Sequence, residues 1–261
     1  SVRVRAYESW TSWGYGADEA LRTGIYTLVV CLSNTTPLPL SYGQTASGSF
    51  GVDCQIVNYS FAGSVGDVVS AVYVGPAVTR RLRILDPAGN VLAASGAGTG
   101  VGILDLVLPQ NGTYRLAAEA QDNSTLGAFG VGLSVLDDGT PIAFNTLVNT
   151  SIAQFAESDL YTFNGVSGSF VTVDFSTPSV SSRPDLVSRL ELIRPDGTVA
   201  ATNPSCGYTN RLDNIAVNQN GTWTVRVRAY ESWTACGYGV DTNIVIGNYT
   251  VRVCNSASCP P

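Results

Sequence analysis

Thr224-Val-Arg-Val-Arg-Ala-Tyr-Glu-Ser-Trp-Thr-Ala-Cys-Gly-Tyr-Gly239 repeats, with few changes, the opening Ser1-Val-Arg-Val-Arg-Ala-Tyr-Glu-Ser-Trp-Thr-Ser-Trp-Gly-Tyr-Gly16. The correspondence continues without a gap at the same spacing, as far as Pro37 and Pro260. In both copies Val and Ala alternate with Arg and Tyr, the period of two that is typical of a β-strand with one buried face. The sequence therefore predicts that residues 1–37 are the closing part of a module.

A second, weaker repeat divides the rest of the chain. Three motifs occur twice in the same order: Tyr59–Gly63, Leu82–Gly89 and Asn111–Tyr114, then Tyr161–Gly165, Leu190–Gly197 and Asn220–Trp223. The sequence thus predicts three parts: a partial module with its linker at 1–37, a β-sandwich at 38–138, and a β-sandwich with a C-terminal tail at 139–261.

The turns and linkers indicate the fold class. Pro-x-Gly and Asn-Gly motifs separate short alternating stretches, and no long stretch has a helical period. The predicted fold is all-β, with tandem antiparallel jelly-roll-like β-sandwich modules and a partial module at the N-terminus. The linkers 33–39 and 137–141 are short and contain Pro, which favours a stiff connection.

Composition restricts the function. The chain has 261 residues, 44% of them hydrophobic and only 13% charged, with a net charge of −6. All 14 basic residues are Arg, and His, Lys and Met do not occur. An acidic chain without a basic patch argues against nucleic-acid partners, and no apolar run is long enough for a membrane span. Because His, the usual general base, and Lys, the usual reactive amine, are missing, we expect neither an enzyme nor a cofactor. A glycosidase that uses carboxylates alone is the one enzymatic alternative.

The cysteines and glycosylation motifs indicate the compartment. An even number of Cys without zinc-ligand spacing favours disulfides, with Cys206–Cys236 and Cys254–Cys259 as expected pairs and Cys31 and Cys54 on either side of a linker. An alternative for Cys254 is a disulfide into a following module, as is expected for Cys31. Asn-x-Ser/Thr motifs occur at Asn34, Asn58, Asn111, Asn123, Asn149, Asn220 and Asn248. Some of these motifs are equally well explained as turns. Together they predict an extracellular or cell-surface glycoprotein.

The order of motifs resembles that of the bacterial pre-peptidase C-terminal (PPC) domain family. The resemblance is carried by Tyr161–Gly165, Leu190–Gly197, Asn220–Trp223 and Gly247–Val251, and it covers both full modules. In the partial module only the last motif, Gly24–Leu28, is present. The resemblance implies a jelly-roll-like β-sandwich that accompanies secreted proteins and is mostly non-catalytic, with calcium or an extracellular polymer bound by some members.

The segment that is retained most closely is rich in Tyr and Trp, which dominate interface energetics. One interpretation is a contact with an adjoining module or protomer; core packing after a recent duplication and sugar stacking are the others. The expected assembly interface comprises Val2, Val4, Tyr7, Trp10, Trp13, Tyr15 and Tyr26. Two or three strands without a partner sheet are marginal, so we expect residues 1–32 to pair with strands from another module or protomer.

Carboxylates supply the remaining candidate sites. A calcium site would use Asp185, Asp196 or Asp213, although scattered Asp in turns is the simpler explanation. The pairs Glu157 with Asp159 and Asp137 with Asp138 are expected to be solvated loop charges rather than an acid–base pair.

The sequence thus predicts a structural subunit of an extracellular filament, sheath or surface stalk. Assembly would run head to tail, by strand complementation and aromatic packing, because contacts that do not close into a ring produce filaments. The expected partners are copies of the chain itself, with glycans as a further class. The alternatives are a secreted polysaccharide- or matrix-binding module and an accessory region of a larger secreted hydrolase.

Overall fold

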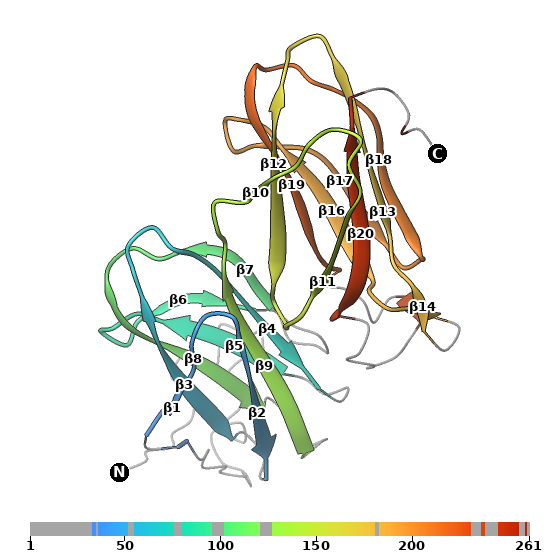
Figure 1. Cartoon of the computed structure of the whole chain (residues 1–261). Helices are drawn as coiled ribbons and strands as arrows, with labels where there is room; N and C mark the ends of the chain where they lie inside the picture. The colour runs from blue at the N-terminus through green and yellow to red at the C-terminus, as the bar shows by residue number, and fades with distance from the viewer. Residues whose placement is uncertain are drawn as a thin grey trace, which may run out of the picture. The chain divides into compact units, whose positions relative to one another are not determined.

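The structure is a computed structural model that describes residues 33–34, 36–51, 55–75, 80–95, 102–120, 127–180, 183–230, 236–237, 245–255 and 259. All of them belong to one compact unit, Cys31–Pro261. Within these ranges the chain forms two β-sandwiches and a small hairpin (Figure 1). The predicted all-β fold is confirmed.

The first sandwich packs a five-stranded sheet on a four-stranded sheet. In spatial order the larger sheet contains β1 (Leu38–Pro39), β3 (Ile56–Gly63), β8 (Gly112–Ala120), β5 (Arg80–Leu85) and β6 (Val91–Ala94). The smaller sheet contains β2 (Gln44–Phe50), β9 (Gly127–Val135), β4 (Val68–Val74) and β7 (Gly102–Val107). Neighbouring strands are antiparallel except for β1 and β3, which run parallel.

The second sandwich repeats this order strand for strand. Its larger sheet contains β10 (Thr140–Pro141), β12 (Ser158–Gly165), β19 (Gly221–Ala229), β16 (Ser188–Ile193) and β17 (Val199–Ser205). Its smaller sheet contains β11 (Val148–Ile152), β20 (Gly247–Cys254), β13 (Phe170–Ser176) and β18 (Thr209–Ala216). The hairpin consists of β14 (Ser179–Val180) and β15 (Arg183–Pro184). Because the strand orders match, each sheet strand of one sandwich has an equivalent in the other.

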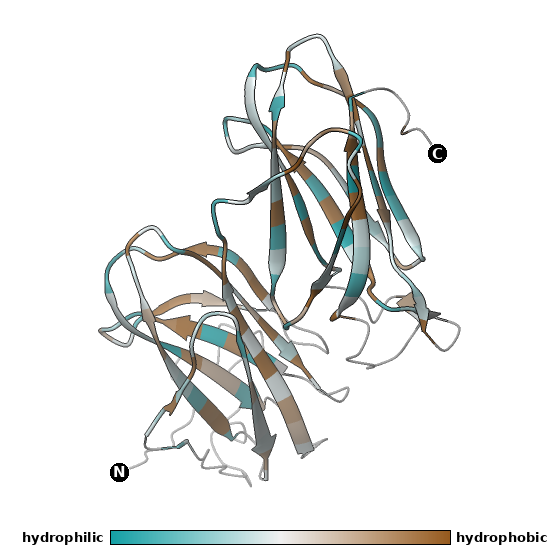
Figure 2. Ribbon diagram, in the orientation of Figure 1, coloured by the Kyte–Doolittle hydropathy of each residue, from teal (hydrophilic) through white to brown (hydrophobic). Residues whose placement is uncertain are grey.

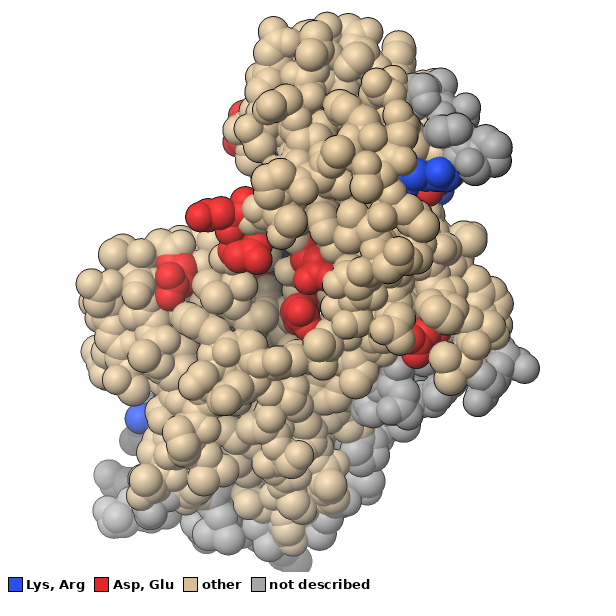
Figure 3. Space-filling model, viewed as in Figure 1, with Lys and Arg blue, Asp and Glu red and all other residues tan. Residues whose placement is uncertain are grey.

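Alternation along the strands produces the two cores. Figure 2 shows apolar and polar residues alternating along individual strands, as expected when one face packs inward. Tyr59 and Tyr114 are fully buried in the first core, and Trp223 and Tyr249 are fully buried in the second. The outer surface carries few charged side chains on the face seen in Figure 3, in keeping with the low charged fraction of the sequence.

Two disulfides close loops in the second sandwich. Cys206 bonds to Cys236 and Cys254 bonds to Cys259, the two pairs expected from the sequence. Cys31 and Cys54 lie outside the described residues. Disulfides persist in oxidising surroundings, so both bonds fit an extracellular location. Within the described ranges, no helix has the length and apolar character needed to cross a bilayer.

Candidate functional site: the contact between the two sandwiches

Strand β19 lies in the middle of its sheet and carries the repeated sequence. It pairs antiparallel with β12 on one side and with β16 on the other. Val225 and Val227 point inward and are fully buried, and Trp223 lies beside them in the same core. The predicted core face is therefore correct, because Val225 and Val227 build the core. The expectation that the other face is exposed to water is wrong, because Arg226 and Arg228 on that face are buried as well.

The outward face of β19 holds a buried ion cluster. Glu191 on β16 accepts a hydrogen bond from Arg226 Nε at 2.5 Å and one from Arg228 Nη2 at 3.2 Å. Only 5% of Glu191, 6% of Arg226 and 7% of Arg228 is exposed. Burial alone would raise the pKa of Glu191, but the charges of Arg228 and Arg226 outweigh it and hold the pKa below its ordinary value. The cluster is thus ionised in the folded protein.

Arg226 also reaches the first sandwich. Its Nη1 donates to Asp105 Oδ1 at 2.7 Å, a contact between residues 121 positions apart in the sequence. Asp105 lies on β7 where the pairing with β4 shifts register, and it adopts a left-handed φ of 56°. Such bulges redirect side chains. Ser70 Oγ accepts a hydrogen bond from the Asp105 backbone N–H at 3.2 Å, which supports the bulge.

The second sandwich has the same bulge with a different side chain. Asn214 takes the place of Asp105 at the register shift between β13 and β18, with φ of 50°. Its backbone N–H donates to Thr172 Oγ1 at 3.1 Å, just as that of Asp105 donates to Ser70. Because Asn carries no charge, the position equivalent to Asp105 offers no anion in the second sandwich.

The ion cluster also has a counterpart in the first sandwich, with the charges exchanged. The strand registers make Arg83 equivalent to Glu191 and Glu119 equivalent to Arg228. Arg83 and Glu119 form an ion pair, so the Glu191–Arg228 pair has an equivalent in the first sandwich with the charges exchanged. Ala117 stands where the second sandwich has Arg226. The residue that reaches across to the other sandwich therefore has no charged counterpart in the first one.

A turn of the second sandwich completes the contact. Ser134 Oγ on β9 donates to the carbonyl of Ala156 at 2.5 Å, and Phe155 packs over Gly130 and Gly132 of the same strand. Glu157 accepts hydrogen bonds from the backbone N–H groups at 153 and 154, which holds the turn closed. This carboxylate is thus a turn-capping group rather than a free loop charge.

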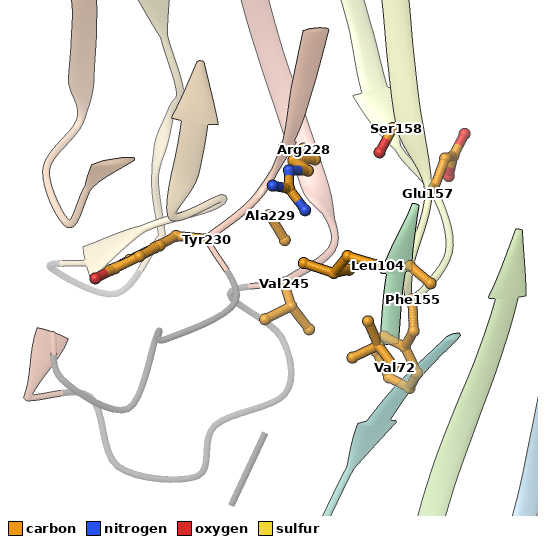
Figure 4. Close-up of a pocket in the computed structure, with 10 residues that line it drawn as sticks. Val72, Leu104, Phe155, Glu157, Ser158, Arg228, Ala229, Tyr230 and Val245 are labelled. Carbon is orange, nitrogen blue, oxygen red and sulfur yellow. The ribbon is translucent and has the colours of Figure 1, made fainter. Parts of the chain in front are cut away.

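A small cavity lies beside these residues (Figure 4). Its volume is about 30 Å³, and its lining includes Val72 and Leu104 from one sandwich and Phe155, Arg228 and Tyr230 from the other. A space of this size holds about one water molecule, whereas sites for small molecules measure roughly 300–1,000 Å³. The contact is therefore a packed joint and not a substrate pocket.

Tyr230, the copy of Tyr7, takes part in both the fold and the contact. Its backbone N–H donates to the Val187 carbonyl at 3.0 Å, and the Arg189 guanidinium lies 5.5 Å from its ring centre. Tyr230 also packs on the apolar cluster of Val74, Val187 and Val245, which joins residues of both sandwiches. For this aromatic position, the core and interface interpretations both hold.

The half-buried Asp159 belongs to a polar cluster inside the second sandwich. Tyr249 donates a hydrogen bond to its carboxylate, and the hydroxyls of Tyr161 and Tyr249 lie 2.7 Å apart. Burial and, to a smaller extent, the charges of Glu157 and Asp137 raise the pKa of Asp159 to about 6, against the lowering effect of the Tyr249 hydrogen bond. Burial and the carboxylate likewise raise the pKa of Tyr249 well above its usual range. The prediction of a solvated Asp159 is wrong, because the strand alternation turns this residue toward the core.

This cluster makes the second sandwich sensitive to pH. The pKa of Asp159 is higher in the folded state than in the unfolded chain, so folding favours the protonated form. The resulting stability is present below about pH 4 and is lost as the pH rises through about 6. We expect a loss of about 1 kcal/mol in the free energy of unfolding, discounted because the carboxyl is partly exposed. Thermal unfolding between pH 4 and 7 measures it.

The control for this prediction is Asp159→Asn, which keeps the shape and the hydrogen bond from Tyr249 but cannot titrate. Its melting temperature should vary less with pH than that of the wild-type protein. Equal pH profiles for the two proteins would contradict the prediction.

The other predicted sites are distributed over the molecule. Asp185 accepts hydrogen bonds from the Asn248 backbone and side chain, Asp196 accepts from Thr198 and Gln219, and Asp213 pairs with Arg211. Asp137 accepts from the Gly139 N–H, so it caps the linker turn. Across the part of the chain that the structure describes, no group of three or more acidic or Cys side chains is arranged to hold a metal ion.

The glycosylation motifs separate into three kinds. The Asn34 amide forms hydrogen bonds with the backbone of Asn58, and the buried Asn58 amide bonds to Ser33 and Asn34, so a glycan on either would remove these bonds. Asn111 and Asn220 are exposed and cap the loops at Val65 and Ser167 through Oδ1. Asn149 and Asn248 are exposed near each other on β11 and β20. Asn123 lies outside the described residues.

The assembly residues Val2, Val4, Tyr7, Trp10, Trp13, Tyr15 and Tyr26 lie outside the described residues as well. Their copies at 225, 227, 230, 236 and 249 are described, and all five take part in the second sandwich or in the cluster at the contact. Sequence reasoning missed Asp105, Ser134 and Phe155. The Gly130-Val-Gly132 pattern, which leaves room on β9, was the one signal that a neighbour approaches closely there.

Comparisons with known proteins leave the family open. No protein-family model matches the chain, and no curated protein matches it. Among solved structures, the pre-peptidase C-terminal domain of a Bacillus anthracis collagenase is 18% identical over 45% of this chain and 96% of its own, with a TM-score of 0.35. The CUB1-EGF-CUB2 region of human MASP-1/3 is 8% identical over 80% of this chain and 99% of its own, with a TM-score of 0.24. At these TM-scores neither likeness supports an argument about this chain, and the PPC resemblance stays a prediction from the motifs.

Proposed function

We propose that the chain is a building block of an extracellular structural array, such as a filament, sheath or stalk, in which β-sandwiches follow one another. One observation carries the proposal: the repeated sequence forms β19, whose inward Val residues close a sandwich while its outward Arg226 contacts the neighbouring sandwich. A segment that both closes one module and contacts the next is what a tandem array requires.

The spacing of the repeat supports this role. The separation in sequence between Ser1 and its copy Thr224 corresponds to the length of two sandwiches. The two sandwiches are not interchangeable at the contact, since Asp105 is replaced by Asn214 and Ala117 by Arg226. The repeating unit is therefore the pair of sandwiches. Residues 1–32 supply the closing strands of a further sandwich of the second type.

Electron microscopy of the native material in negative stain tests the proposal directly. Threads with two beads per repeat are the expected result. Isolated globular particles at every concentration would argue against an array.

The contact itself is tested by Gly132→Ala. A Cβ at this position would overlap the backbone carbonyl of Phe155, so the turn at 153–157 must move away. We expect the contact to open, with a larger radius of gyration in solution X-ray scattering and faster amide exchange at 153–157. Both cores lie elsewhere and share no partners with this position. The free energy of unfolding of each sandwich should therefore stay within about 1 kcal/mol of its wild-type value.

Gly130→Ala is the matched control on the same strand. There the added Cβ meets the Phe155 ring edge at 2.9 Å and Thr45 Cγ2 at 3.8 Å, and the Phe155 side chain can rotate aside. Its scattering profile should stay close to that of the wild-type protein. Indistinguishable profiles for the two variants would remove the contact from the proposal.

A further inference from the structure

We infer that residues 1–16 of one copy of this chain can replace the resident segment 224–239 in the second sandwich of another copy, and that the Cys206–Cys236 disulfide keeps the resident segment in place. The inference rests on the proposed role of residues 1–32 as closing strands. It adds the partner, the acceptor and the condition under which exchange occurs.

The side chains of the two segments are interchangeable in β19. Residues 2–11 are identical to residues 225–234. Val225 and Val227 are fully buried, and their copies Val2 and Val4 are the same residue type. The backbone pairing with β12 and β16 does not depend on side chains. An exchanged strand therefore recovers the inward packing of residues 225–229.

Charge selects the acceptor. In the second sandwich Glu191 receives Arg226 and Arg228, and it would receive the copies Arg3 and Arg5 in the same way. In the first sandwich the position of Glu191 is occupied by Arg83. Two further Arg residues beside Arg83 would bring like charges together in a poorly solvated place. Only the second sandwich accepts the segment.

The described second sandwich is already complete, so the incoming segment has to displace a strand. Its larger sheet holds β19 between β12 and β16, with eight residue pairs on one side and six on the other. Exchange therefore puts a nearly identical segment in the place of the resident one, which costs little where the two segments make the same contacts.

The disulfide distinguishes the two segments. Between residues 2–16 and 225–239 the sequence changes at two positions, Ser12 for Ala235 and Trp13 for Cys236. Cys236 is bonded to Cys206, in the loop between β17 and β18, across a sequence separation of 30 residues. The incoming segment carries Trp at that position and cannot form the bond. With the disulfide closed the resident segment is covalently tied at Cys236. With it open the resident segment is held only by its chain connections at either end, and an incoming copy displaces it as the protein concentration rises.

The test compares the wild-type chain with the Cys206→Ser/Cys236→Ser variant in size-exclusion chromatography with light scattering. We expect one mass for the oxidised wild-type chain over a hundredfold range of concentration. The variant should add dimers and larger species whose fraction rises with concentration. Adding Val2→Asp and Val4→Asp to the variant prevents only the incoming segment from packing into the core, so the mass should return to that of a monomer.

A variant that keeps the wild-type mass, or oligomers that persist with Val2→Asp and Val4→Asp, would overturn the inference. A fluorescent peptide of residues 1–16 provides a second measurement, because its anisotropy should rise with the Ser variant and not with the oxidised wild-type chain. No rise with either protein would also overturn it. The proposed array is tested separately, by electron microscopy of native material and by Gly132→Ala. A failure of strand exchange and a failure of the proposed function therefore give different results.

Discussion

Glu191→Ala is expected to lower the free energy of unfolding of the second sandwich by about 3–5 kcal/mol, the usual cost of removing one partner from a buried ion pair. The substitution leaves Arg228 buried without its carboxylate, and Arg226 with Asp105 alone. The loss arises because all three members of the cluster are buried, so that a positive charge left without its carboxylate has neither a counter-charge nor water around it. Denaturant unfolding followed by circular dichroism measures the loss.

The matched variant replaces the whole cluster. Glu191→Leu with Arg226→Met and Arg228→Met removes the charges together and keeps similar volumes. Apolar replacement of a buried ion cluster is often neutral or stabilising, so this triple variant should be at least as stable as the wild-type chain to within about 1 kcal/mol. If Glu191→Ala costs nothing, or if the triple variant is the less stable of the two, the account of the cluster is wrong.

Trp223→Ala is expected to destabilise the same sandwich by about 3–5 kcal/mol through the cavity that it leaves. Trp223 is fully buried, and its Nε1 donates to the Gln219 carbonyl at 3.0 Å. The loss should appear in calorimetry as a lower transition for the second sandwich, while the first sandwich keeps its own.

The chain supplies the control. Tyr114 is the equivalent residue in the first sandwich, and its hydroxyl donates to the Gln110 carbonyl at 2.6 Å. Trp223→Tyr reproduces that arrangement and should cost much less than Trp223→Ala. Equal losses for the two substitutions would show that cavity volume does not govern stability at this position.

Local pattern was sufficient to predict the strands. The alternation at 224–230 assigned Val225 and Val227 to a core before any partner strand was known, because residues two apart share a face of a strand. The Pro-x-Gly and Asn-Gly turns located the strand ends for the same local reason. The pairings Cys206–Cys236 and Cys254–Cys259 were also predicted correctly, the second because its two cysteines are close together in the sequence.

The contact between the sandwiches was not predictable in this way. Asp105 and Arg226 are far apart in the sequence, and they meet only because a bulge in β7 turns Asp105 toward the other sandwich. Asp159 was expected in solvent, but it alternates with Tyr161 and Phe163 on β12 and therefore lies on the inward face, where Tyr249 of the other sheet donates to it. The bulge in β7 leaves no sign in the neighbouring sequence.

The sequence by itself determined the all-β class, the long repeat and the faces of the repeated strand, since these depend on residue identity and on side-chain periodicity within a few residues. Only the tertiary structure decided that Arg226 and Arg228 share Glu191 and that Arg226 contacts Asp105. Those contacts join groups that come near each other only after the sheets have paired, and the energy of a buried charge depends on all of its neighbours at once.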